Sequence, residues 1–313
     1  MTKRNSIENM KDEVAGWRRE LHQNPGVKHE EEFAHNFIKA RLDEMGVPYK
    51  TGYGGYGIVA TIEGQDVSSG KTIGLRADMD ALPLTEESGQ PWASKIDGKM
   101  HACGHDGHTA ILLGAAKYLN ETKNFNGKVH LIFQPAEEGF KGAKAMMKDG
   151  LFEKYPCDEV YGLHNWPWLE IGKMAVREKE FFAASDSLTV EIRGKGGHAA
   201  FPHNTVDPLV IATDIIQAIQ TIVSREIDPA DTAVISITNL NVGTGAFNII
   251  ADTAKFTGTI RTFKEDTRKF IQSRIKDIVS SMARSRRADV LTCEIEEILY
   301  PTVNPPVATE HAL

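Results

Sequence analysis

The residues best suited to chemistry form one short run, His101-Ala-Cys103-Gly-His105-Asp106-Gly-His108. Thiolate and imidazole groups are ligands that zinc and related divalent cations prefer, and a Cys-x-His pair on an extended loop can converge on one ion. A single histidine in this context would favour a polar loop with a helix N-cap. Three histidines, a cysteine and an aspartate within eight residues indicate a metal site instead.

A pair of aspartates, Asp78 and Asp80, follows the apolar segment Thr72–Leu75. Open α/β sheets bind their ligands beyond the carboxyl ends of the strands, so these carboxylates stand where a site is expected. Asp80 can hold the outer nitrogen of a metal-bound histidine, as carboxylates around metal sites commonly do. Taken alone, both residues are equally well explained as turn or helix-cap residues.

Two adjacent glutamates, Glu137 and Glu138, follow the apolar strand expected over residues 128–134. Adjacent loop residues point in different directions, so one can bind a cation while the other takes a proton from water and delivers it to a leaving amine. His164 ends a further expected strand, Glu159–His164. A solvated acidic pair and a structural histidine are the ordinary alternatives, and the convergence of several strand ends argues against them.

The elements that must position these residues alternate between helix and strand. Apolar spacing predicts helices over residues 6–23, 30–44, 109–119 and 142–148, and strands over 57–63, 72–77, 128–134 and 159–164. This alternation predicts an α/β sandwich with a largely parallel sheet.

The pattern changes after about Ala184. Strands are expected over residues 188–193, 233–240, 253–261 and 290–296, and helices over 206–225 and 267–283. The order βαββαβ is that of the ferredoxin-like split unit, so we expect a second domain inserted into the first. The Pro-rich closing segment, Tyr300 to Leu313, is expected to form no element.

The second domain offers three further candidate residues. A glycine-rich turn, Gly194 to His203, presents His198, and it lacks the lysine-serine ending of a phosphate loop. A histidine donor can stabilise the oxyanion of a tetrahedral intermediate. Arg261 can pair with a substrate carboxylate, and Asn248 lies on or near a strand of the same domain. A plain turn and surface roles are the alternatives.

Composition narrows the class of protein. The net charge of −7 and the scattered lysines and arginines argue against a nucleic-acid partner. No apolar segment has the length of a membrane span, and the polar N-terminus does not resemble a secretory signal. Three widely spaced cysteines do not resemble a disulfide framework, so a cytoplasmic location is expected.

Taken together, these motifs resemble the dinuclear metallopeptidase/amidohydrolase family in its aminoacylase–hippurate hydrolase branch. This branch includes N-acyl-L-amino acid amidohydrolases, N-acetyldiaminopimelate deacetylases and auxin-conjugate hydrolases. The resemblance runs over essentially the whole chain and rests on five stretches: Arg76–Pro83, Met100–Thr109, Phe133–Gly139, Gly162–Asn165 and Gly194–His203.

The resemblance implies a function and a role for each residue. The activity is metal-dependent hydrolysis of the amide bond of small N-acyl amino acids, such as N-acetyl or N-benzoyl (hippurate-like) compounds. The cofactors are two divalent metal ions, zinc or manganese, with cobalt or nickel as further options. Glu137 resembles the general base and Asp80 the carboxylate that orients the site, while His198 resembles a lid histidine that reaches the partner subunit. The implied ligands are Cys103, His105, Glu138 and His164.

The resemblance also implies the domain plan. A phosphorylase/hydrolase-like α/β/α catalytic domain spans residues 1–180, and a ferredoxin-like α+β lid that forms a homodimer spans 181–299. Residues 300–313 resemble the return to the catalytic domain, whose last metal-binding histidine is absent from this sequence, so a C-terminally truncated form is expected. Asn248 and Arg261 resemble lid positions near the substrate.

Three alternatives stay open at this point. The chain is a catalytically impaired relative that acts as a binding or dimerisation module, or it is a metallo-carboxypeptidase or dipeptidase acting on small peptides. In the third alternative, Cys103 is a covalent nucleophile. That reading is disfavoured because the surrounding histidines and carboxylates suit a cation better.

Overall fold

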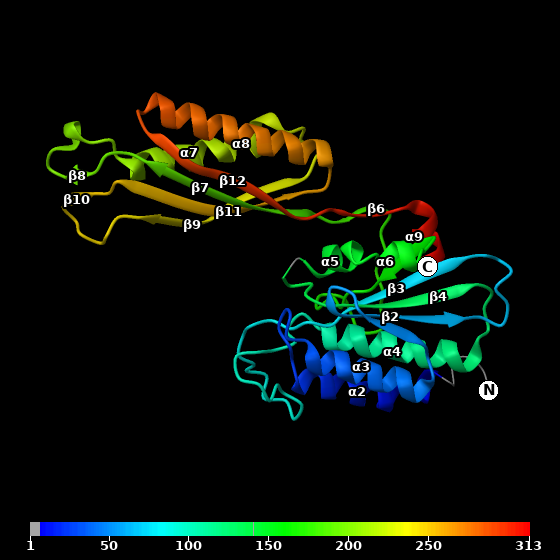
Figure 1. Ribbon diagram of the computed structural model, residues 1–313. Helices are drawn as coiled ribbons and strands as arrows, with labels where there is room; N and C mark the ends of the chain where they lie inside the picture. The colour runs from blue at the N-terminus through cyan, green and yellow to red at the C-terminus, as the bar shows by residue number, and fades with distance from the viewer. Residues whose placement is uncertain (1–6, 140) are drawn as a thin grey trace. The chain divides into compact units, whose positions relative to one another are not determined.

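The structure is a computed structural model that describes residues 7–139 and 141–313. The chain divides into two compact units, Met1–Lys173 and Met174–Leu313. We call these unit 1 and unit 2 and treat each separately (Figure 1). The division expected from the sequence, with boundaries at residues 180 and 299, stays a prediction.

A five-stranded sheet forms the centre of unit 1, with the order β1-β2-β4-β3-β5. Its strands are β1 (Tyr49–Gly52), β2 (Gly55–Glu63), β3 (Thr72–Asp78), β4 (Lys128–Gln134) and β5 (Glu159–Gly162). β3 is parallel to β4 and β5, whereas β2 is antiparallel to β1 and β4. The prediction of a largely parallel sheet is therefore wrong, and the sheet is mixed. A short glycine-rich turn joins β1 to β2, and only antiparallel strands can follow so short a connection.

Helices cover both faces of this sheet (Figure 1). One face packs against α2 (Lys11–Gln23), α3 (Glu32–Met45) and α4 (His105–Thr122), and the other against α5 (Gly142–Lys148) and α6 (Leu151–Lys154). β4 shows how the sequence specifies the layers, because successive side chains of a strand point to opposite faces. Leu131 and Phe133 join the larger core, and Ile132 joins the smaller one. Unit 1 is an α/β/α sandwich, and Ser6, the expected start of the first helix, lies outside the described residues.

Helix α4 begins at His105, four residues before the predicted start at Thr109. Gly104, with φ of 89°, supplies the left-handed conformation from which the chain turns into the helix. His105 and His108 therefore lie one turn apart on the same helix face, where the sequence alone suggested a loop.

Unit 2 contains a four-stranded antiparallel sheet with the order β12-β7-β11-β9. Along the chain, β7 (Ala184–Arg193), α7 (Pro208–Thr221), β9 (Ala233–Val242), β11 (Thr253–Thr262), α8 (Glu265–Ser285) and β12 (Asp289–Leu299) follow one another. This βαββαβ order is the predicted one. A π-helical turn, Ile222–Glu226, extends α7, and the core is dominated by isoleucines from the helices and the sheet.

The prediction that the closing segment of unit 2 forms no element is wrong. The segment after Tyr300 forms β13 (Thr302–Asn304) and the short helix α9 (Pro306–Ala312). β13 pairs with β6 (Lys179–Phe182), a strand that the sequence did not reveal. Segments of three or four residues carry too little periodicity to be recognised, and each is a strand only because the other pairs with it.

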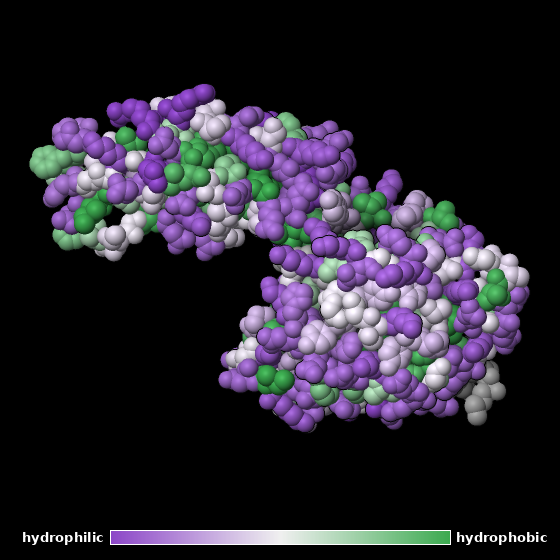
Figure 2. Space-filling model, in the orientation of Figure 1, coloured by the Kyte–Doolittle hydropathy of each residue, from purple (hydrophilic) through white to green (hydrophobic). Residues whose placement is uncertain are grey.

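Within residues 7–139 and 141–313, no helix combines the length and the apolar character needed to cross a bilayer. On the face drawn in Figure 2, unit 1 is mostly hydrophilic, and its hydrophobic residues are scattered rather than gathered in one patch.

Candidate metal centre

The candidate metal centre of unit 1 lies where three neighbouring parallel strands end. β4, β3 and β5 lie side by side and run in the same direction, so their carboxyl ends meet at one edge of the sheet. Asp78 ends β3, Glu137 and Glu138 follow β4, and His164 follows β5. His164 lies two residues past the end of β5 rather than closing it as predicted.

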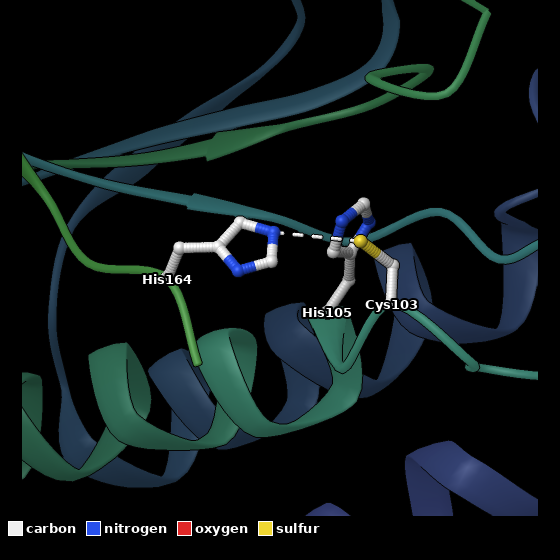
Figure 3. Close-up of side chains that lie close together, drawn as sticks. All are labelled: Cys103, His105 and His164. Carbon is white, nitrogen blue, oxygen red and sulfur yellow. Dashed lines mark hydrogen bonds between the residues drawn. The ribbon is translucent and has the colours of Figure 1, made fainter. Parts of the chain in front are cut away.

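One group of possible ligands consists of Cys103, His105 and His164, whose ligand atoms all lie within 4.8 Å of one another (Figure 3). The Sγ atom of Cys103 is 3.4 Å from Nε2 of His164. Nδ1 of His164 lies 2.8 Å from the carbonyl oxygen of Asn165, which can only accept a hydrogen bond. In the neutral ring Nδ1 therefore carries the proton, and the lone pair of Nε2 faces the thiol, as a metal ligand requires.

His105 belongs to all three groups of side chains that could hold a metal ion. The other two groups are Asp78, His105 and His108, and His105, Glu137 and Glu138. Its Nδ1 donates to Asp80, at 2.9 Å from the backbone oxygen and 3.2 Å from Oδ1. Its Nε2 faces the carboxylates of Asp78, Glu138 and Glu137, at 3.6, 3.9 and 4.0 Å. The ring is thus oriented by one carboxylate and aimed at three others.

Two buried atoms at this point test whether a metal fits. Nε2 of His105 and Oε1 of Glu138 have no hydrogen-bond partner within residues 7–139 and 141–313. Buried polar atoms are almost always paired, and a nitrogen and an oxygen 3.9 Å apart are too far from each other for a hydrogen bond. Imidazole and carboxylate are also ligand types of zinc and manganese, so the residues present fit a divalent cation.

The electrostatics of the site favour positive charge. Burial alone would lower the pKa of His105, but its hydrogen bond with Asp80, the nearby Cys103 and the charge of Asp78 raise that pKa to about 11. Burial likewise opposes ionisation of Asp78, yet the hydrogen bond from His108 and the charge of Arg76 hold the pKa of Asp78 well below its usual range. A cation placed here would meet the same negative potential.

Glu137 and Glu138 differ in their surroundings. The backbone N–H of Glu138 donates to Oδ2 of Asp80 at 2.9 Å, so the residue that orients His105 also fixes this turn. The side chain of Glu137 is 29% exposed. Burial raises the pKa of Glu137, and although His105 opposes this rise, the charges of Asp78 and Glu138 add to it.

His108 is a residue of this site to which the sequence assigned no role. Its Nδ1 lies 2.6 Å from Oδ1 of Asp78, and its Nε2 accepts from the backbone N–H of Asn165 at 3.1 Å. Asp78 is ionised and can only accept, so the proton of the imidazole sits on Nδ1. Nε2 also lies 2.7 Å from the side-chain amide of Asn165. His108 thereby ties Asp78 to the loop that carries His164, and its spacing of three from His105 was the available signal.

Behind the metal-binding loop, His22 lies between two carboxylates. Its Nδ1 is 2.7 Å from Oδ2 of Asp106, and its Nε2 is 3.2 Å from Oε1 of Glu86. Both carboxylates can only accept, so His22 donates from both nitrogens and is an imidazolium. The hydrogen bond with Asp106 raises the pKa of His22, although burial opposes the rise. Arg18 also reaches Asp106, at 2.7 Å.

The three candidates in unit 2 have different surroundings. His198 in β8 (Gly197–His198) and Asn248 are brought together because β8 pairs with β10 (Ile249–Ile250) and the N–H of Ala199 donates to the carbonyl of Asn248 at 3.0 Å. Both side chains are exposed. Arg261 lies apart from them on β11, where its guanidinium bonds Thr259 and, at 3.1 Å, the carbonyl of Ile260.

Comparison with known proteins gives consistent matches. The sequence profile of peptidase family M20/M25/M40 matches residues 74–312. A hippurate hydrolase from Campylobacter jejuni is 43% identical over 273 residues, which cover 87% of this chain and 70% of that protein. An N-acetyl-L-cysteine deacetylase from Bacillus subtilis is 42% identical over 288 residues, covering 91% of this chain and 68% of that protein.

A solved structure is also similar. The YXEP protein of Bacillus subtilis, described as a dinuclear metal binding peptidase from the M20 family, matches with a TM-score of 0.83 and 31% identity. The match covers 97% of this chain and 79% of that one.

These matches identify the chain as a metal-dependent hydrolase of amide bonds. The profile match covers more than half of the chain, and two relatives exceed 40% identity. The chain belongs to peptidase family M20/M25/M40. The family resemblance inferred from its motifs is confirmed.

Proposed function

We propose that the protein hydrolyses the amide bond of small N-acyl amino acids, releasing a carboxylate and an amino acid. The observation that carries this proposal is the pair of buried, unpartnered atoms, Nε2 of His105 and Oε1 of Glu138, which face each other among the described ligand groups. The hippurate hydrolase and the N-acetyl-L-cysteine deacetylase indicate the substrate class.

The proposed ligands of two divalent ions are Cys103, His105, Glu138 and His164. Zinc or manganese suits this mixture of thiolate, imidazole and carboxylate, and cobalt or nickel is a further option. When bound, such ions supply Lewis acidity, which polarises a carbonyl group and makes water more acidic. Asp80 holds Nδ1 of His105 and the backbone N–H of Glu138, so it orients two of the four ligands.

Glu137 is the proposed general base. Its raised pKa brings the carboxylate closer to the pH at which it works, where it can accept a proton and release it again. It takes the proton from the attacking water and delivers it to the leaving nitrogen. Its partial exposure leaves the carboxylate accessible to water.

Unit 2 contributes the proposed substrate contacts. His198 donates a hydrogen bond to the oxyanion, and Asn248 and Arg261 bind the substrate, with Arg261 suited to its carboxylate. We infer a ferredoxin-like lid over residues 181–299 between catalytic segments 1–180 and 300–313, a homodimer formed through this lid, and a cytoplasmic location. The pairing of His198 with Ile249 supports a shared role for His198 and Asn248.

A substrate panel tests the proposal. Protein loaded with Zn²⁺ or Mn²⁺ is assayed with N-acetyl and N-benzoyl amino acids and with unblocked dipeptides, before and after chelation. We expect hydrolysis of the acylated compounds that chelation abolishes. A preference for dipeptides would favour a peptidase, and activity that survives chelation but not thiol alkylation would favour Cys103 as a nucleophile. Failure of the metal-loaded protein to act on any compound would support a binding module and contradict the proposal.

A further inference from the structure

A strained residue immediately precedes the two glutamates. Ala136 has φ of 49°, in the left-handed region that residues with a Cβ rarely adopt, and it is fully buried. Such conformations persist only where the surroundings hold them. The turn it forms sets the direction of Glu137 and Glu138, because both follow it directly.

The residue that holds Ala136 comes from a distant part of the chain. Oε1 of Glu31 accepts a hydrogen bond from the backbone N–H of Ala136 at 2.8 Å, across 105 positions of sequence. Glu31 stands at the N-cap of α3, yet its side chain makes no capping bond there. It is fully buried, at 0% exposure, so the carboxylate is directed at the turn and away from solvent.

Other contacts fix the rest of the turn. The N–H of Gly142 donates to the carbonyl of Ala136 at 3.2 Å, and a Cβ on Gly142 would lie 1.6 Å from the carbonyl oxygen of Pro135. The N–H of Glu138 is held by Asp80 at 2.9 Å. Glu31 therefore supplies the partner of the one backbone N–H that belongs to the strained residue itself.

Burial raises the pKa of Glu31, and the backbone N–H groups of Glu31, His29 and Ala136 oppose that rise. Loss of the carboxylate oxygen would leave the N–H of Ala136 buried without a partner. A turn released in this way relaxes toward negative φ, which redirects the two side chains that follow.

We propose that Glu31 is a positioning residue of the metal site, which holds Ala136 in its left-handed conformation and thereby aims Glu137 and Glu138. This inference rests on the proposed function for the roles of the two glutamates. Glu31 itself is neither one of the proposed metal ligands nor the proposed base.

Two conservative substitutions separate the hydrogen bond from the charge. Glu31→Gln removes the charge but keeps an oxygen at the same reach, and Glu31→Asp keeps the charge but shortens the side chain by one methylene. Binding of Zn²⁺ to the metal-free protein is measured by competition with a chelator, alongside kcat. We expect Glu31→Asp to lower the affinity for Zn²⁺ by about 10–100-fold, the usual loss when a residue supporting a ligand is removed, and Glu31→Gln to retain it.

A third variant tests the strain. Glycine adopts positive φ without steric cost, so Ala136→Gly added to Glu31→Asp is expected to restore part of the lost affinity. The matched control is Asp158, which accepts from the backbone N–H of Thr72 at 2.8 Å across 86 positions, outside the metal site. Asp158→Glu is expected to change the melting temperature without changing the affinity for Zn²⁺.

Unchanged affinity in Glu31→Asp, or equal losses in Glu31→Asp and Glu31→Gln, would overturn the inference. The affinity for Zn²⁺ is measured without substrate. The role of Glu31 and the proposed function can therefore be contradicted independently of each other. A protein that hydrolyses no N-acyl amino acid but loses affinity on Glu31→Asp contradicts the proposed function alone. A working hydrolase with unaltered affinity in that variant contradicts the role of Glu31 alone.

Discussion

The two units bury charge in opposite ways. In unit 1 a dense set of ionisable side chains lies at 1–2% exposure around the ends of three strands: Asp78, Asp80, His105, Asp106 and His108. In unit 2 the core is almost entirely aliphatic, and its buried charges, Asp186 and Arg268, neutralise each other directly. In unit 2 the buried cation and anion lie against each other, although Nη1 of Arg268 has no hydrogen-bond partner among the described residues; in unit 1 the unpartnered atoms of His105 and Glu138 lie among further ligand groups that a cation would satisfy.

This difference indicates that unit 1 contains the reactive centre, whereas the core of unit 2 serves as a scaffold. A buried polar atom without a partner costs stability, and in unit 1 two such atoms lie within a cluster of metal-ligand side chains, which points to a cation. The candidates in unit 2, His198 and Asn248, are exposed and carry no such signature. Their assignment depends on the family, while that of the metal site also has a physical basis in unit 1.

The largest expected effect is on turnover by unit 1. Glu137→Gln removes the proposed base, and we expect kcat to fall by about 100–10,000-fold, the usual contribution of proton transfer by a positioned side chain. Metal content should stay unchanged, as measured by elemental analysis of the same samples. Glu153→Gln, at an exposed position on α6, is the control and should retain activity. Full turnover in Glu137→Gln would show that the base is another group.

The next largest effect concerns the buried ion pair of unit 2. Nε of Arg268 lies 3.0 and 3.1 Å from the two oxygens of Asp186, so Arg268→Met leaves a buried carboxylate without its cation. We expect the free energy of unfolding of unit 2 to fall by about 3–5 kcal/mol. Circular dichroism reports the helices of both units, while tryptophan fluorescence reports on unit 1 alone, because Trp17, Trp92, Trp166 and Trp168 all precede residue 174. A transition seen by circular dichroism without a change in fluorescence is therefore assigned to unit 2.

The double variant Arg268→Met/Asp186→Leu is the control for this pair. Replacement of both charges by apolar groups is expected to recover most of the loss, because no buried charge remains. Zn²⁺ affinity should be unchanged in both variants. A loss of metal binding on Arg268→Met would show that this ion pair of unit 2 also supports the metal site, contrary to the prediction.

A smaller effect is expected at His108, which ties Asp78 to the loop that carries His164. His108→Ala removes the link between Asp78 and Asn165, and we expect Zn²⁺ affinity to fall by about 10–100-fold. His130→Ala is the matched control, since His130 is a buried histidine of the same unit that contacts Thr61 instead. Equal affinities in the two variants would rule out a supporting role for His108.

The smallest effect is a dependence of stability on pH. The pKa of His22 is raised in the folded protein, so the stability it contributes is fully present below its unfolded value of 6.5 and is lost as the pH rises through the folded pKa. The groups that face it are Asp106, Glu86, Arg18 and His101. The difference in melting temperature between wild type and His22→Gln should therefore shrink from pH 6 towards pH 9. A difference that is constant over this range would contradict an imidazolium at this position.

Much of this fold could be predicted from apolar periodicity. The largely apolar strand β4 and the short helix Gly142–Lys148 have the predicted bounds. Two of the unpredicted strands, β6 and β13, depend on each other as partners far along the chain. Helix α4 was predicted to begin too late, because its first turn consists of site residues that resemble a polar loop.

For the candidate site, too, the residue types could be predicted from the sequence, whereas the contacts between distant residues could not. The ligand types could be read from the Cys-x-His run and from the positions of strand ends. The contact between Glu31 and Ala136 spans 105 residues and involves a backbone N–H, so no residue pattern encodes it. The positive φ of Ala136 is equally hidden, since alanine gives no sign of a left-handed conformation.

The most direct test is the binding of Zn²⁺ to chelator-stripped protein by equilibrium dialysis, comparing the wild type with His105→Ala. His105 belongs to each of the three ligand groups, so its loss should weaken all of them. We predict about two ions bound per wild-type chain, as in other two-metal hydrolases, and a large loss of affinity in His105→Ala. Binding in His105→Ala that equals that of the wild type would contradict a metal centre at this edge of the sheet.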